Sequence, residues 1–138
     1  MGVCAEATEA ELETAVASLG ELPAVAELRV PETGLVMVRG RIGGSGRPFN
    51  LGELSVTRAA VRLANGCTGI SYLLGRAPRR ARLAALLDAL GQDPAYRARL
   101  DASLMAPVLA RVAEKDRALG ADAAATKVDF FTLVRGEG

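Results

Sequence analysis

Apolar residues near the start of the chain recur at helical spacing. From Leu12 they fall at positions i, i+4 and i+7, which is typical of one buried face of a helix. Thr8 and Glu11 form a capping-box pattern ahead of this face, and Gly20 stands where a helix C-terminus is often closed. The pattern predicts a helix over residues 9–19.

Alternating apolar and polar residues predict the strands that follow. We expect a short edge strand over residues 25–30 and a turn formed by Pro31 with Gly34. A second strand is predicted over residues 35–42, mostly buried at its start. A run of Gly and Ser followed by proline then interrupts the alternation, so residues 43–52 are predicted to be a loop.

The dipeptide Asn65-Gly66 is the strongest turn signal in the sequence. It predicts a two-residue type I′ turn between two alternating segments, with Leu63 opposite Thr68. Arg58 and Arg62 then lie together on one side of the hairpin, as candidates for an anion or partner contact. The opposite side is predicted to pack inward and carries Thr57, Ala59, Val61, Leu63, Thr68, Ile70, Tyr72 and Leu74.

Two more helices and a last strand are predicted in the second half of the chain. One helix begins at Pro78 and ends at Gly91, and a second begins at Asp93-Pro94 and is bent by Pro107. Residues 127–135 have a β-like pattern. The inner rows of the two helices are Leu83, Leu86, Leu87 and Leu90, and Leu100, Leu104, Val108 and Val112.

These elements predict a single α+β domain over residues 1–138, with residues 1–7 flexible. An antiparallel sheet, built from the Asn65-Gly66 hairpin, the strand at residues 35–42 and the C-terminal strand, packs against about three α-helices. The chain has 138 residues, of which 50% are apolar and 4% aromatic. One core filled by Leu, Val and Ala is therefore expected.

Composition excludes several kinds of chemistry. The chain has no histidine, which excludes a His-based triad, an imidazole base and nearly all zinc sites. Cys4 and Cys67 are far apart and match no metal spacing, so we predict free thiols and no metal site. No apolar run approaches the length of a membrane span, and no leader is legible, so a cytoplasmic location is expected.

Charge is concentrated in the middle of the chain. Residues 35–82 hold nine arginines and the single acid Glu53, a net charge of +8. Such a region attracts phosphates, nucleotides or an acidic partner, although solvated strand and loop faces explain the charge equally well. Nucleic-acid binding is disfavoured because the region offers only Phe49 and Tyr72 for base stacking.

The glycine-rich stretch within this region is the candidate site. Its glycines let backbone amides approach phosphate oxygens, and arginines pair with oxyanions, although a plain loop between strands is the alternative. It lacks the Lys-Ser/Thr of a Walker loop. The candidates for anion binding or a subunit interface are Arg39, Arg41, Gly43, Gly44, Gly46, Arg47, Glu53, Arg58 and Arg62.

Two features outside the glycines are open to more than one interpretation. Glu53 is a general-base candidate, but an arginine counter-ion is the favoured interpretation. Near the C-terminus, Phe130 and Phe131 beside Arg135 either close a sheet or anchor a partner subunit. No pair of carboxylates forms a legible site, so no catalytic residue is assigned.

Several of these segments together resemble the PhnG family, a subunit of the bacterial carbon-phosphorus lyase system. The resemblance covers residues 20–137 and is carried by the run LVMVRGRIGGSGRPFNLGELSVTRAAVRL at residues 35–63 and the ending VDFFTLVRGE at residues 128–137. The chain departs from the family pattern in having no Trp and in having Arg80 where the family tends to have His. This difference fits either a structural or interface role at that position or a diverged paralogue with altered activity.

The resemblance implies a non-autonomous subunit of a core complex with PhnH, PhnI and PhnJ, together with PhnL and PhnK. In that system the adenine of ATP is replaced by methylphosphonate, which gives α-D-ribose 1-methylphosphonate 5-triphosphate. The chain is expected to support this transferase reaction in phosphonate metabolism, to bind no cofactor of its own and to be inactive alone. The alternative is a scaffold that stabilises PhnI or PhnJ without touching substrate. An independent nucleotide-binding enzyme is disfavoured by the lack of histidine and of paired acids.

Overall fold

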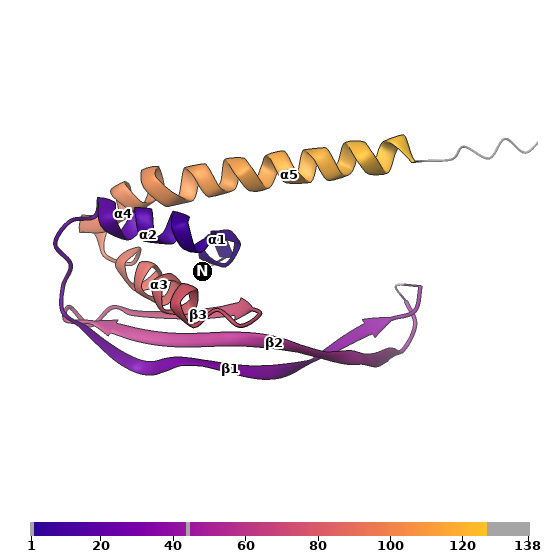
Figure 1. Ribbon diagram of the computed structural model, residues 1–138, viewed down its shortest axis with the longest axis horizontal. Helices are drawn as coiled ribbons and strands as arrows, with labels where there is room; N and C mark the ends of the chain where they lie inside the picture. The colour runs from indigo at the N-terminus through magenta and orange to yellow at the C-terminus, as the bar shows by residue number, and fades with distance from the viewer. Residues whose placement is uncertain (1, 44, 127–138) are drawn as a thin grey trace, which may run out of the picture.

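The sheet and the helices form two layers. The computed structural model describes residues 2–43 and 45–126. A three-stranded antiparallel sheet has the order β1-β2-β3, and the helices lie on one face of it (Figure 1). The α+β class and the antiparallel sheet are therefore confirmed. The strands are β1 (Val25–Arg41), β2 (Pro48–Leu63) and β3 (Thr68–Leu74).

The helices differ greatly in length. A π-helical turn, η1, connects the two helices that follow α3, and α5 projects away from the rest of the helical layer (Figure 1). None of the described helices is long and apolar enough to cross a membrane. Their bounds are α1 (Gly2–Glu6), α2 (Glu9–Ser18), α3 (Pro78–Leu90), α4 (Pro94–Leu100), η1 (Asp101–Met105) and α5 (Ala106–Ala125).

The N-terminal helix α2 begins at the predicted capping box. Thr8 Oγ1 accepts a hydrogen bond from the Glu11 amide at 3.2 Å, and the Glu11 carboxylate accepts one from the Thr8 amide at 2.7 Å. Leu12 and Leu19 are buried, which confirms the predicted face. Residues 2–6, expected to be part of a flexible stretch, form α1.

Strand β1 runs without interruption through the predicted turn. The prediction of two strands separated at Pro31 and Gly34 is wrong, because irregularities in the register between Glu27 and Glu32 let one strand continue. Pro31 is tolerated because β1 lies at the edge of the sheet, where an outward position needs no amide donor. Leu35 is 61% exposed, so the expected burial of this segment is also wrong.

Strand β2 begins earlier than predicted. The predicted loop over residues 43–52 is wrong in its second half, since residues 48–52 pair with β1. The loop is closed at its base by the Gly46 amide, which donates to the Ile42 carbonyl at 3.0 Å. Pro48 is the first residue of the strand, one of the few places where a sheet accepts proline.

The β2–β3 hairpin lies at Asn65-Gly66 as predicted, but its register is shifted by one residue. The Leu63 amide donates to the Cys67 carbonyl at 2.9 Å, which encloses a three-residue loop. Gly66 has φ +90°, whereas Asn65 does not adopt the positive φ that a type I′ turn requires. Arg62 therefore pairs with Thr68.

This shift exchanges the two faces of β3. Ile70, Tyr72 and Leu74 were predicted to face inward, but they lie on the open face of the sheet and are exposed. Ser71 and Leu73 face the core instead. The inward prediction holds on β2, where Thr57, Ala59, Val61 and Leu63 are all buried.

Helix α3 lies across the inner face of β2 and β3, with the bounds that its proline and glycine predicted. Its buried face includes four alanines, which let the helix backbone approach the sheet closely. A Cβ atom placed on Gly69 of β3 would lie 2.0 Å from the Ala85 carbonyl oxygen and 2.4 Å from the Ala89 nitrogen. Only glycine fits at this contact.

The predicted second helix is divided into α4, η1 and α5. Its inner row is confirmed, with Leu100, Leu104 and Val108 buried. The Ala106 amide donates to the Asp101 carbonyl, five residues earlier, at the end of η1. Pro107 follows in the first turn of α5, so the expected irregularity takes the form of a π-turn. The predicted strand at residues 127–135 lies outside the described residues.

The Gly69 contact gives a first prediction. Gly69→Ala should lower the free energy of unfolding by about 2–3 kcal/mol, because the added methyl meets helix backbone that cannot move aside cheaply. Urea denaturation measures the change. Gly34→Ala is the matched control, since open space surrounds that position, and should change stability by less than about 0.5 kcal/mol. Equal effects of the two substitutions would contradict the packing argument.

The contact between α2 and α5 predicts a pH effect. Arg111 and the Thr8 amide, through hydrogen bonds, lower the pKa of Glu11 from 4.5 to about 2. The carboxylate therefore stabilises the fold above pH 4.5, and this contribution disappears as the pH falls through 2. Glu11→Gln should cost up to about 1 kcal/mol at pH 7, the range of exposed ion pairs, and little at pH 2.

Urea midpoints of the wild type and Glu11→Gln, measured from pH 7 to pH 2, test this expectation. Glu114→Gln, which removes a carboxylate from the exposed pair with Arg117, controls for the loss of surface charge. A constant difference between the wild type and Glu11→Gln across the whole range would show that the carboxylate's charge is not responsible.

Candidate functional site

The glycine-rich stretch forms the end of a long hairpin. Strand β3 pairs with residues 56–62 of β2, so β1 is the only described strand whose register includes residues 48–55 of β2. We call residues 34–41 of β1 and 48–55 of β2 the arm. It extends beyond the helices that cover the rest of the sheet (Figure 1).

Both faces of the arm carry exposed apolar side chains. Leu35 and Met37 lie on the face that continues the helix side of the sheet, and they are 61% and 51% exposed. On the other face Val36 is paired with Leu54, which is 47% exposed. Leu51 also remains exposed, although it lies over the Gly40 backbone. A two-stranded ribbon cannot bury such residues by itself.

Three arginines gather at the tip of the arm. Arg39 and Arg41 are at the end of β1, and Arg47 immediately precedes β2. Arg41 Nη1 donates to the Gly46 carbonyl at 3.2 Å and so helps to close the loop. Within the described part of the chain, neither Arg39 nor Arg47 has an ion-pair partner. Exposed guanidinium groups of this kind can bind phosphate or carboxylate oxygens in pairs.

The other candidate arginines lie away from the tip, on the open face of the sheet. Arg58 Nε contacts Glu32 Oε1 at 2.7 Å, and Arg62 Nε donates to Thr68 Oγ1 at 3.4 Å. Hydrogen bonds from Arg29 and then Arg58 lower the pKa of Glu32. Arg58 is therefore already in an ion pair, whereas Arg39 and Arg47 form none with the residues that the structure describes.

Three of the four remaining arginines of the basic region hold parts of the fold together. Arg79 pairs with Glu13 of α2, and Arg82 pairs with Glu27 of β1. Arg80 Nε donates to the Ala7 carbonyl at 2.8 Å, which fixes the end of the α1 segment against α3. The sequence charge of the region thus overstates the cationic surface, because acidic residues from the first 34 positions neutralise part of it.

Of the other sequence candidates, the structure describes Glu53 and Gly43 but not four further residues. Glu53 stands opposite Met37 on the arm, and among the described residues it forms no ion pair with an arginine. The expected counter-ion is therefore not seen there. Gly43 lies in the loop at the tip. The candidates Gly44, Phe130, Phe131 and Arg135 lie outside the described residues and stay predictions.

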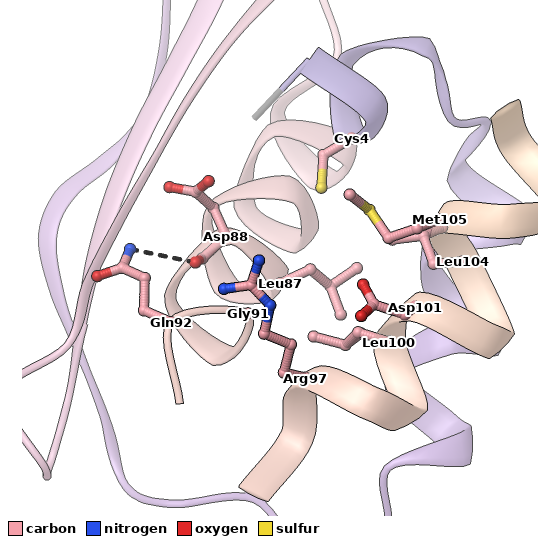
Figure 2. A pocket seen from close by; sticks show the side chains of 10 residues that line it. All are labelled: Cys4, Leu87, Asp88, Gly91, Gln92, Arg97, Leu100, Asp101, Leu104 and Met105. Carbon is pink, nitrogen blue, oxygen red and sulfur yellow. Dashed lines mark hydrogen bonds between the residues drawn. The ribbon is translucent and has the colours of Figure 1, made fainter. Parts of the chain in front are cut away.

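A cavity of about 180 Å³, which the sequence did not predict, lies where α1, α3, α4 and η1 meet (Figure 2). Cys4 Sγ and the Met105 side chain point into it, and Arg97 reaches its edge. Burial raises the pKa of the Cys4 thiol. The lining residues are Cys4, Leu87, Asp88, Gly91, Gln92, Arg97, Leu100, Asp101, Leu104 and Met105.

No spacing in the sequence indicates this cavity, because Cys4 is more than eighty residues from the other lining residues. Polar groups at the edge of the cavity already form hydrogen bonds within the protein. Asp88 Oδ2 accepts a hydrogen bond from the Ile70 amide at 3.1 Å. Gln92 Nε2 donates to the Asp88 carbonyl at 3.2 Å (Figure 2). Among the described residues, no group of three or more Cys, Asp or Glu could hold a metal ion.

Comparison with known proteins relates nearly the whole chain to a family. Residues 1–136 match the family model described as "Phosphonate metabolism protein PhnG". The chain is 54% identical over 137 residues to the "Alpha-D-ribose 1-methylphosphonate 5-triphosphate synthase subunit PhnG" of Rhizobium meliloti (strain 1021). The alignment covers 99% of this chain and 87% of that relative.

Thiol accessibility tests the position of Cys4. Cys4 is 5% exposed, while Cys67 is only partly buried beside the hairpin turn. With N-ethylmaleimide at pH 8, Cys67 should react at least about tenfold faster than Cys4, whose burial limits both access and thiolate formation. Cys67→Ser should leave only the slow reaction, and denaturant should make the two thiols equal. A fast reaction that persists in Cys67→Ser would contradict the burial of Cys4.

Proposed function

This chain belongs to the PhnG family, and from that premise we propose that it is an accessory subunit of an α-D-ribose 1-methylphosphonate 5-triphosphate synthase. The family match covers nearly the whole chain, and the relative from Rhizobium meliloti is a subunit of such a synthase by name. The substrates of the complex would be ATP and methylphosphonate. We assign no cofactor and no catalytic residue to this chain, and we expect it to be inactive alone.

The observation that best supports a subunit role is the arm. Its exposed apolar residues on two faces have no cover within the described chain, and such surfaces are typical of protein–protein contacts. The proposed partners are PhnH, PhnI and PhnJ, with PhnL and PhnK, in a cytoplasmic complex. Phe130, Phe131 and Arg135 remain candidates for the same interface.

The tip arginines provide a link to the chemistry of the substrates. A triphosphate and a phosphonate are both anions, and guanidinium groups bind such oxygens through charge-assisted hydrogen bonds. We propose that Arg39 and Arg47 contact substrate in the assembled complex, with Gly43, Gly44 and Gly46 giving the loop close access. Arg41 acts with them and also holds the loop through Gly46.

The second candidate function is a scaffold that stabilises PhnI or PhnJ without touching substrate. It is favoured by the arginines that are already used within the chain. Arg58 pairs with Glu32, and Arg80 holds the carbonyl of Ala7. Under this alternative the tip arginines would bind acidic side chains of a neighbouring subunit.

Substitution of the tip arginines separates the two functions. The complex carrying Arg39→Ala and Arg47→Ala should keep its subunit composition and lose at least about tenfold in synthesis rate, since each lost charge-assisted hydrogen bond costs about 1.5–3 kcal/mol. The measurements are subunit ratios in the purified complex and the rate of triphosphate product formation from ATP and methylphosphonate.

Arg117→Ala is the matched control, because Arg117 is an exposed arginine whose ion pair among the described residues is with Glu114 of its own helix. An intact complex with an unchanged synthesis rate would contradict substrate contact by the tip arginines and favour the scaffold function. Loss of this chain from the complex would instead place the tip arginines at a subunit boundary. Synthesis by the isolated chain would overturn the accessory role itself.

A further inference from the structure

The two edges of the sheet differ in whether their outward backbone groups are hydrogen-bonded. At the β3 edge, side chains of α3 and of its C-terminal flank occupy backbone groups that point outward. Asp88 Oδ2 accepts from the Ile70 amide at 3.1 Å, and Gln92 Nε2 donates to the Thr68 carbonyl at 2.8 Å. At the β1 edge, no described residue donates to or accepts from an outward backbone group. The long strand β1 is therefore the open edge of the sheet.

The hydrogen bonds of β2 determine which residues of the arm face this edge. The Ser55 carbonyl accepts from the Gly75 amide at 2.8 Å, so the backbone groups of Ser55 point toward β3. Backbone groups alternate in direction along a strand, and those of Leu54 therefore point toward β1. Leu54 is paired with Val36, whose amide and carbonyl are used inside the arm.

It follows that Leu35 and Met37, on either side of Val36, direct their amides and carbonyls outward. Their side chains are also more than half exposed. Backbone donors and acceptors and apolar side chains are thus presented at the same residues. This combination is what an added strand recognises: main-chain hydrogen bonds give affinity and alternate side chains give specificity.

The rest of β1 carries features that protect an edge, and this segment does not. Pro31 lacks an amide, the register is irregular around it, and Arg29 and Glu32 are charged. Residues 34–38, with the sequence GLVMV, contain neither proline nor charge. Natural proteins block exposed apolar edges unless another strand pairs there. The missing protection is local to the arm.

We propose that residues 34–38 of β1 accept an extended strand from a partner subunit of the synthase complex. This inference rests on the proposed function and adds the mode of contact to it. The added strand turns the two-stranded arm into a three-stranded one, the smallest sheet expected to be stable when packed. It carries alternating apolar residues without an excess of basic side chains, and it leaves Arg39 and Arg47 accessible to the anions proposed above.

Charge favours a different protein over a second copy of this chain. The arm holds Arg39 and Arg41, with Arg47 in the adjoining loop, against the single acid Glu53, a net charge of +2. Two copies of the arm carry the same net positive charge and therefore repel each other. A strand from another subunit that carries no net positive charge avoids this repulsion.

Hydrogen exchange of individual amides, in the free chain and in the purified co-expressed complex, tests the pairing directly. The Val36 amide should be protected in both samples. The Leu35 and Met37 amides should exchange freely in the isolated chain and at least about tenfold more slowly in the complex. A complex that contains the chain but leaves both amides unprotected overturns the strand pairing and leaves the proposed function standing.

Two substitutions of Met37 distinguish the contribution of its backbone amide from that of its side chain. Met37→Pro removes the outward donor and should reduce recovery of the chain in the complex at least about tenfold more than Met37→Ala does. Circular dichroism of the isolated variants confirms that both fold. Equal recovery of the two variants would overturn the pairing, and the exchange measurement on wild-type chain decides the matter if the proline variant does not fold.

The isolated chain distinguishes the other occupants. Protection of Leu35 and Met37 that rises with concentration, together with dimers in light scattering that Met37→Pro abolishes, would assign the edge to a second copy and overturn the proposal. A co-expressed complex that never contains the wild-type chain would instead contradict the accessory-subunit function.

Discussion

The close contact between α3 and Gly69 is the constraint on which the arrangement of this fold depends. The Ala85 carbonyl and the Ala89 amide lie where any larger residue would place its Cβ atom, so only glycine at position 69 lets β3 approach the helix this closely. That contact fixes which face of β3 points inward. Ser71 then reaches the Ala81 carbonyl at 2.7 Å, and Asp88 reaches the Ile70 amide at the edge. The position of α3 on the sheet, the inward face of β3 and the hydrogen bond at its edge are therefore all consistent with the close approach at Gly69.

Because the helices cover only one face and one end of the sheet, the chain buries its core without enclosing the arm. Arginine side chains connect the helices in the part of the molecule that covers the sheet. Arg111 joins α5 to α2 through Glu11, and Arg80 holds the α1 segment to α3. Most of the basic region is consumed in this way or neutralised by nearby acids. Arg39 and Arg47, at the tip of the arm, have no ion-pair partner within the described chain, so the molecule has a supporting end and a contacting end.

The proposed place of this chain in a complex accounts for such an incomplete surface. A subunit that always works inside a complex can leave apolar faces and a strand edge open, since its partners supply the missing cover. The same residues in a free monomer would promote aggregation. The apolar arm and its cationic tip are thus consistent with one another: the apolar part is suited to docking, and the tip is suited to anions or acidic side chains.

The sequence by itself determined the features that depend on local interactions. The Thr8 capping box, the proline and glycine that bound α3, the hairpin at Asn65-Gly66 and the α+β class were all legible, and the family resemblance is confirmed. Each depends on residues within a few positions of one another, or on motifs that the family shares.

Only the tertiary structure decided the features that depend on distant residues. The β3 register was predicted one residue out, because turn geometry at Asn65 and the packing of Gly69 against α3 outweighed the apolar pattern of Ile70 and Tyr72. The joining of two predicted strands into β1 depended on pairing with β2 across Pro31. The exposure of the arm could not be read from its apolar residues, since apolar alternation indicates a surface to be covered but not whether the same chain covers it.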